Sequence, residues 1–283
     1  MMRAHFVLGP LAGIACLVVA SVALPADATA VASLENANCL RCHDARAEKI
    51  EVPGPDDEAR ELGAVDLRKY GKGIHGDLQC VACHTGIVDS QAGHRQAAGV
   101  APPNCISCHE TLWESVRKEG LTREKARLGE VVENIAAYRN SFHARPDTDN
   151  PDRPKASCED CHSSHEFNVP PKGTARRTAW HKEIPETCGA KCHEDQLEDY
   201  AASIHGEAVL DSGNIKAAVC TDCHSAHSVA NTSTDSFKLA NVNTCGNCHK
   251  EELASYTDTY HGQVNRLGYT YTARCVDCHD SHG

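Results

Sequence analysis

Cys220-Thr221-Asp222-Cys223-His224-Ser225-Ala226-His227 is the stretch that decides the fold of this chain. A histidine directly follows its second cysteine, and another histidine stands three positions further on. The core of the stretch, C-x-x-C-H, occurs seven times, and an eighth copy has one extra residue between its cysteines. The regular copies are Cys39–His43, Cys80–His84, Cys105–His109, Cys158–His162, Cys220–His224, Cys245–His249 and Cys275–His279, and the longer copy is Cys188–His193.

This motif has a specific chemical use. Two thiols add to the two vinyl groups of one haem, and the adjacent imidazole then reaches the iron. Zinc ribbons also use paired cysteines, but they give no reason for a histidine after every pair. Disulfides would not impose such uniform local spacing. The motifs therefore predict about eight covalently bound haems of the c type (heme c).

The predicted attachment sites use every cysteine after Cys16. The cofactor-binding cysteines are Cys39, Cys42, Cys80, Cys83, Cys105, Cys108, Cys158, Cys161, Cys188, Cys192, Cys220, Cys223, Cys245, Cys248, Cys275 and Cys278. The motif histidines, which we call proximal, are His43, His84, His109, His162, His193, His224, His249 and His279.

The composition agrees with a fold built around cofactors. The chain has 283 residues with 17 cysteines and 18 histidines, but aromatic residues make up only 5 %. A core made from side chains alone would be thin for this length. We expect short α-helices and irregular segments wrapped around the haems, with little or no β-sheet. The longest candidate helix is Arg123–Phe142, which carries an apolar stripe weakened by Gly129.

The first 30 residues read as a signal peptide. Arg3 precedes an apolar run from Phe6 to Leu24, and Ala28-Thr29-Ala30 is a typical cleavage site. The alternative is an uncleaved anchor, because the run approaches a membrane-spanning length. We expect cleavage, which removes Cys16 and both methionines. It also predicts a periplasmic or secreted protein without a membrane span.

A second repeat supplies further histidines. Tyr-x4-His occurs four times, each time between two haem motifs, and a histidine follows three positions after three of the motifs. The first set is His75, His143, His205 and His261, and the second set is His165, His227 and His282. The chain is thus predicted to form four two-haem modules: A (34–103), B (104–186), C (187–243) and D (244–283).

These histidines are the expected distal ligands, on the far side of each iron. A chain without methionine after cleavage cannot form a His/Met haem, so we predict bis-histidine ligation. Seven distal ligands come from the two sets, and His94 or His181 supplies the eighth, with His94 preferred. The sequence leaves open which distal histidine serves which haem. The repeated tyrosines are expected to pack on a porphyrin or to hydrogen-bond a propionate.

With these motifs, the whole chain after the signal resembles the periplasmic multihaem cytochromes c of anaerobic respiration. It is similar to an octahaem relative of the small tetrahaem cytochrome c and NapC/NirT groups. The resemblance implies bis-histidine haems in close stacked and crossed pairs that act as an electron relay. The chain lacks the C-x-x-C-K motif of the pentahaem nitrite reductases, so their activity is not implied.

We therefore expect an electron carrier more than an enzyme. Its partners would be redox proteins, namely a membrane-associated donor and a periplasmic or outer-membrane acceptor, and not nucleic acid. The net charge of −11 favours docking to basic partner surfaces. One alternative is an octahaem oxidoreductase that acts on small nitrogen or sulfur oxyanions at an open haem, expected in module A. Another is a conducting filament in which His282 ligates a haem of the next chain. The sequence does not give the oligomeric state.

Overall fold

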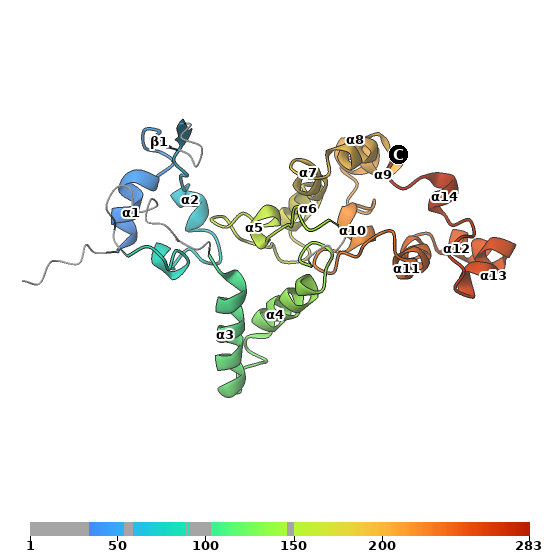
Figure 1. The fold of residues 1–283 in the computed structure, drawn as a ribbon, viewed down its shortest axis with the longest axis horizontal. Helices are drawn as coiled ribbons and strands as arrows, with labels where there is room; N and C mark the ends of the chain where they lie inside the picture. Colours follow the sequence, from blue (N-terminus) through green and yellow to red (C-terminus); the bar gives the residue numbers. More distant parts are fainter. Residues whose placement is uncertain (1–33, 54–58, 89, 91–102, 146–149) are drawn as a thin grey trace, which may run out of the picture.

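The computed structural model describes residues 34–53, 59–88, 90, 103–145 and 150–283, and the predicted signal peptide lies outside them. The described chain is mostly helical or irregular, as expected, and it extends from module A at one end of the long axis to module D at the other (Figure 1). The helices are α1 Asn36–His43, α2 Leu67–Tyr70, α3 Cys105–Lys118, α4 Ala126–Arg139, α5 Cys158–Cys161, α6 Ala175–Lys182, α7 Ile184–Gly189, α8 Glu194–Ala202, α9 Ile204–Gly206, α10 Cys220–His224, α11 Asp235–Gly246, α12 Lys250–Asp258, α13 Tyr260–Arg266 and α14 Val276–His279. A 3₁₀ turn, η1, covers Cys80–Ala82, and a π-helical turn, η3, covers Glu207–Asp211.

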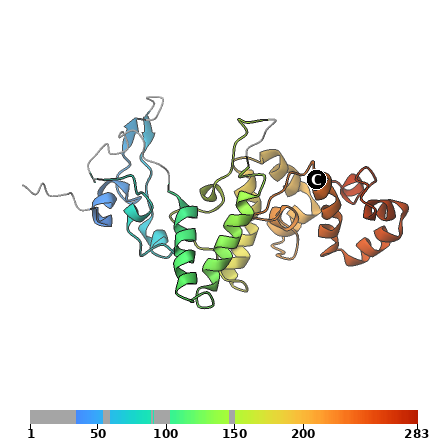
Figure 2. The same cartoon turned by 60° about the horizontal axis from the view of Figure 1, so that its bottom comes forward.

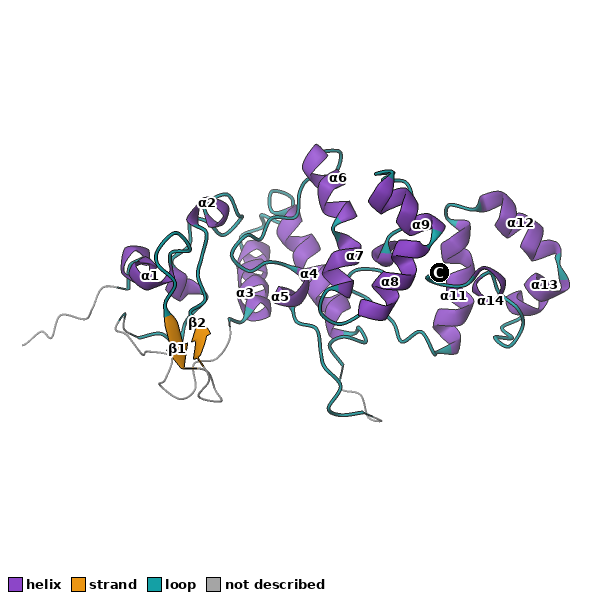
Figure 3. Cartoon of the chain, turned by 90° about the horizontal axis from the view of Figure 1, so that it is seen from above, coloured by secondary structure: helices purple, strands orange, loops and turns teal. Residues whose placement is uncertain are grey.

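The only sheet among the described residues is a two-stranded antiparallel pair, β1 (Glu51–Pro53) and β2 (Ala59–Glu61). Its register places Glu51 opposite Glu61. Three-residue strands cannot form a core of their own. The sheet is a local feature of module A, and helices and loops make up the rest of the described chain (Figure 3).

Helices α3 and α4 form an antiparallel hairpin in the middle of the molecule (Figure 2). Gly129 makes their close approach possible, because a Cβ there would lie 2.9 Å from the ring of Trp113. From the sequence, Gly129 was expected to weaken the predicted helix, but in the structure it lets α4 pack closely against Trp113 of α3. The helix is shorter than predicted, because it begins at Ala126 and ends at Arg139.

The polypeptide buries few apolar side chains. The one cluster of buried core residues within the described part of the chain joins Ile184, Val209 and Val219. Several large apolar side chains, such as Val88, Ile204 and Leu267, are instead 75 %, 80 % and 87 % exposed. The side chains alone therefore leave much surface for another group to cover.

Two details of the predicted helical faces are wrong. The spacing of Leu197, Tyr200, Ala201 and Ile204 predicts one apolar helical face, but α8 ends at Ala202 and Ile204 is 80 % exposed. The spacing of Leu253, Tyr256 and Tyr260 predicts a second such face, but Tyr260 starts a new helix and is also exposed. Both errors have one cause, since the chain turns at Ser203 and at Thr259 just before each ligand histidine.

Within the described ranges, no helix combines the length and the apolar character that crossing a bilayer requires.

Candidate functional site

Twelve of the sequence-predicted ligand histidines lie in six facing pairs. Each pair joins one proximal histidine to one predicted distal histidine. The ring centroids are separated by 6.0 Å in His75–His109, 6.3 Å in His84–His165, 6.2 Å in His143–His193, 6.0 Å in His162–His227, 6.1 Å in His205–His249 and 6.1 Å in His224–His282. The angles between ring planes are all between 18° and 36°. One spacing thus recurs at six places far apart in the chain.

This spacing is the one that an iron held between two imidazoles requires. With metal–nitrogen bonds of about 2.0 Å and about 1.1 Å from nitrogen to ring centre, two axial rings have centroids about 6.2 Å apart. No cluster of three or more His, Cys, Asp or Glu side chains suited to a bare metal ion occurs among the described residues. The residues present therefore fit haem iron, which takes only two ligands from the protein and four from the porphyrin.

The pairs follow a rule that the sequence alone left open. Three of the four Tyr-x4-His histidines face the first motif of the next module, as His75 faces His109. Each histidine at the +3 position faces the second motif of the preceding module, as His165 faces His84. Every one of the six sites is therefore shared between two neighbouring modules, and the modules interlock.

Burial favours the neutral form of several of these imidazoles. It lowers the pKa of His162, and the charge of His227 lowers it further. The same two causes, burial first and then the facing histidine, lower the pKa of His84, His109 and His143. A neutral imidazole has a free lone pair, which is the form that binds a metal.

The sixteen cysteines in the described part of the chain are all unbridged. Within each module, the first cysteine of one motif lies beside the first cysteine of the other. A hydrogen bond from Cys158 lowers the pKa of Cys105 to about 6 and raises that of Cys158. Cys188 and Cys220 interact in the same way. In modules A and D, burial is the larger cause of the raised pKa of Cys80 and Cys245, and the neighbouring Cys39 and Cys275 add to it.

Cysteines of adjacent modules also lie close together. Burial raises the pKa of Cys83, and the charges of Cys105 and Cys108 in module B raise it further. Burial and the neighbouring Cys192 likewise raise the pKa of Cys161, and Cys248 has this effect on Cys223. Together with the contacts inside each module, these contacts link all eight motifs in space in the order of the sequence.

The four repeated tyrosines share one hydrogen bond that the sequence analysis missed. Each hydroxyl donates to the backbone carbonyl two positions before the second motif of its own module. The acceptors are Leu78 for Tyr70 at 2.8 Å, Ala156 for Tyr138 at 2.7 Å, Ala218 for Tyr200 at 2.9 Å and Ala273 for Tyr256 at 2.9 Å. Each hydroxyl proton is thus donated to the backbone, and the expected packing on a porphyrin or bond to a propionate stays a prediction. The tyrosine ties the ligand helix to the second motif.

A tight turn sets the direction of each distal histidine of the first set. In module C, Ser203 Oγ donates to the Tyr200 carbonyl at 2.7 Å and accepts from the Gly206 amide at 3.1 Å, so it caps the helix that carries His205. A Cβ on Gly206 would overlap that same carbonyl. In module D, Thr259 and Gly262 repeat this arrangement around His261. The His-Gly pair in the sequence is therefore explained by backbone crowding.

In three of the four modules, an aspartate caps the start of the second motif. The sequence pattern C-x-D-C-H could have predicted this cap. Asp160 accepts from the Ser157 amide at 2.7 Å, and Asp222 accepts from the Val219 amide at 2.8 Å. Asp277 accepts from the Arg274 amide at 2.8 Å. Module A has Ala82 at this position and so departs from the pattern.

Two of the three +3 histidines follow a left-handed turn directly after the proximal histidine. Ser225 after His224 has a φ of 59°, and Asp280 after His279 has a φ of 62°. Residues other than glycine rarely adopt this left-handed conformation. In module D the turn carries the chain back, so that His282 reaches His224 in module C. His282 is thus used within its own chain, and the filament hypothesis loses the ligand on which it was based.

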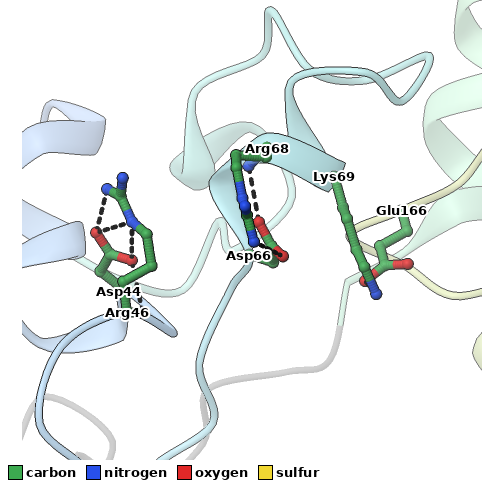
Figure 4. Close-up of polar contacts among 6 residues, drawn as sticks. All are labelled: Asp44, Arg46, Asp66, Arg68, Lys69 and Glu166. Carbon is green, nitrogen blue, oxygen red and sulfur yellow. Dashed lines mark hydrogen bonds and ion pairs between the residues drawn. The ribbon is translucent and has the colours of Figure 1, made fainter.

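Polar and aromatic contacts hold modules A and B together around two of the pairs. Lys69 forms an ion pair with Glu166 at 3.0 Å, beside the local pairs of Asp44 with Arg46 and Asp66 with Arg68 (Figure 4). The Ile74 amide donates to the Phe167 carbonyl at 3.0 Å. The Phe167 ring lies 5.7 Å from that of His75 and 4.7 Å from that of His162.

The remaining predicted ligands fall outside the six pairs for different reasons. His94 is not among the described residues. His43 is oriented by the Gly63 carbonyl, which lies 2.7 Å from its Nδ1. His261 and His279 face no second histidine ring within the described chain. His181 is in no pair either, and its Nε2 is buried without a hydrogen-bond partner among those residues.

Comparison with known proteins adds nothing to this geometry, because no family model, no curated protein and no solved structure matches the chain.

Proposed function

We propose that the chain is a periplasmic or secreted c-type cytochrome that carries about eight haems and relays electrons between redox proteins. The observation that carries this proposal is the set of six histidine pairs with one metal-bridging spacing. Each pair includes the histidine of a haem-attachment motif, so the predicted covalent attachment sites and the predicted iron ligands coincide at the same six places.

The residues divide the work at each site. Two cysteines would hold the porphyrin through thioether bonds, and the two imidazoles would close both axial positions of the iron. The haem, when bound, supplies one-electron chemistry. An iron closed on both sides has no position for a substrate, which favours electron transfer over catalysis at these six sites.

The order of the motifs supports a relay with a single path. Motif cysteines lie near those of the next motif along the described chain, from Cys39 and Cys80 to Cys245 and Cys275. Haems attached there would form one continuous series along the long axis of the molecule (Figure 1). Electrons could then enter at one end and leave at the other.

Partners would be recognised by charge. The chain has 39 acidic and 28 basic residues, and haem propionates would add further negative charge. Basic surfaces on a donor or an acceptor would be steered towards such a protein, and salt would screen this attraction. Rates of electron exchange with a true partner should therefore fall steeply as ionic strength rises.

The test is haem content together with turnover of small oxyanions. The chain is produced in a host that attaches haem c, and haem is counted as the pyridine haemochrome per chain. We expect about eight haems, complete reduction by dithionite, and no turnover of nitrite, hydroxylamine or sulfite with a reduced viologen dye. Sustained turnover would favour the oxidoreductase alternative, and a chain without covalent haem would overturn the proposal.

A further inference from the structure

Module D holds two groups that the pairing rule leaves incomplete. His261 belongs to the Tyr-x4-His set, whose other three members each face a proximal histidine. His279 is a proximal histidine with a complete attachment motif, Cys275–Cys278. Neither ring faces another histidine within the described chain. By the pattern of the other modules, His261 would be a distal ligand with no motif histidine opposite it. His279 would be a motif histidine with no distal ligand opposite it.

His261 is built as a ligand in the same way as His205. Tyr256 binds the Ala273 carbonyl, Thr259 caps α13 and Gly262 makes the tight turn, which repeats the arrangement in module C. Its Nδ1 lies 2.9 Å from Thr272 Oγ1, and Thr272 is itself buried. A hydrogen bond at Nδ1 fixes the tautomer that leaves the Nε2 lone pair free for a metal. A histidine with a purely structural role would not need this full set of supports.

The surface around His261 has the character of an interface. Tyr260, Leu267, Tyr269 and Tyr271 are 76 %, 87 %, 53 % and 80 % exposed. The ring of Tyr260 lies 5.9 Å from that of His261, and the rings of Tyr269 and Tyr271 are 5.7 Å apart. Aromatic side chains of this kind are enriched in protein–protein contacts. The exposed patch and the unused ligand therefore lie together in module D.

We propose that two copies of this chain join through module D, with His261 of each copy ligating the iron of the Cys275–His279 haem in the other. The proposal rests on the proposed function, since it needs that haem. A second copy is the partner that satisfies both incomplete groups at once, because each chain offers one ligand and one iron. A reciprocal contact of this kind is what a two-fold symmetric dimer provides. It would also place two haem series end to end.

The test compares the haem-loaded full chain with His261→Ala, using light scattering after size exclusion for mass and EPR of the oxidised protein for spin state. The wild-type chain should be a dimer with the module D haem low-spin. His261→Ala should be a monomer in which about one haem in eight becomes high-spin. Added imidazole should restore the low-spin signal without restoring the dimer. Gln263→Ala, two positions away on α13, is the matched control and should behave like the wild type.

Two results would overturn the inference. A wild-type monomer with the module D haem low-spin would mean that the ligand comes from its own chain. A high-spin haem in the wild type, unchanged by His261→Ala, would mean that this iron is open to small molecules. If His261→Ala is poorly folded, His261→Met keeps a side chain that can ligate iron and should retain the dimer with a raised potential. In each case a haem count near eight shows that the proposed function stands, so the two failures are distinguishable.

Discussion

At the scale of single residues, the same few side chains recur around each candidate iron. A tyrosine hydroxyl binds the carbonyl ahead of the second motif in all four modules. Six distal histidines face six proximal ones at nearly one distance. The recurrence allows one module to serve as a test of the others, and module C is the most completely described.

Tyr200→Phe removes the hydrogen bond to the Ala218 carbonyl but keeps the ring. Tyr200 is 7 % exposed, so the carbonyl loses a partner in a nearly dry place. We expect a loss of about 1 kcal/mol in stability, seen as a lower thermal midpoint with haem content unchanged. Ser115→Ala, which removes an exposed hydroxyl on α3, is the control and should melt like the wild type. Equal midpoints for all three proteins would show that the hydroxyl has no positioning role.

His205→Ala removes the distal ligand that faces His249. About one haem in eight should change from low-spin to high-spin, because one axial position opens while the thioether bonds remain. Absorption and EPR spectra of the oxidised protein measure this change. Glu198→Ala, at an exposed position on α8, is the matched variant and should leave the spin state as it is. A fully low-spin His205→Ala protein would contradict the assigned pair.

At the scale of elements, short capped helices deliver the ligands. Helices α8 and α12 each end three positions before a distal histidine, and a Ser or Thr then caps the next short helix. In modules C and D, the glycine after the histidine is required because the chain passes directly over the preceding tyrosine carbonyl. Side-chain volume at this one position therefore controls the direction of the ligand.

Gly206→Ala tests that crowding. A Cβ at Gly206 would overlap the backbone of Tyr200 and Ala201, which cannot move aside as a flexible side chain could. We expect a cost of about 1–3 kcal/mol and partial loss of the low-spin signal of the haem ligated by His205. Gly63→Ala is the control, because a Cβ at Gly63 meets nothing within 4 Å. A Gly206→Ala protein as stable as the control would remove this explanation of the His-Gly pair.

Much of this arrangement could be predicted from local sequence. The motifs, the Tyr-x4-His repeat and the +3 histidines depend on short-range spacing, and all the histidines later found in pairs were expected as ligands. The pairing itself could not be predicted, because His75 and His109 are brought together by the path of the chain between modules. The turn at Ser203 was missed for a related reason, since an apolar pattern through Ile204 resembles one continuous helix.

At the scale of the whole molecule, the polypeptide has little core of its own. Among the described residues, the buried cluster of Ile184, Val209 and Val219 is small, and several large apolar side chains are exposed. The interlocking of neighbouring modules is expected to stabilise the fold only when a haem lies between the two histidines of each pair. The haems are therefore expected to serve as the hydrophobic core.

Haem-free protein should accordingly be largely unfolded. Production without haem attachment should give weak helical circular dichroism and no cooperative melt, because the short helices cannot persist without tertiary packing. The haem-loaded chain should melt cooperatively at a much higher temperature. A cooperative melt of the haem-free chain with native helix content would contradict this part of the account.

Iron-edge anomalous diffraction from crystals of the haem-loaded chain would show whether each of the six histidine pairs holds an iron. We expect an iron peak midway between the rings of each pair, from His75–His109 to His224–His282. These irons should form one continuous line that follows the order of the motifs. Irons that lie elsewhere, or motif histidines facing different partners, would contradict it.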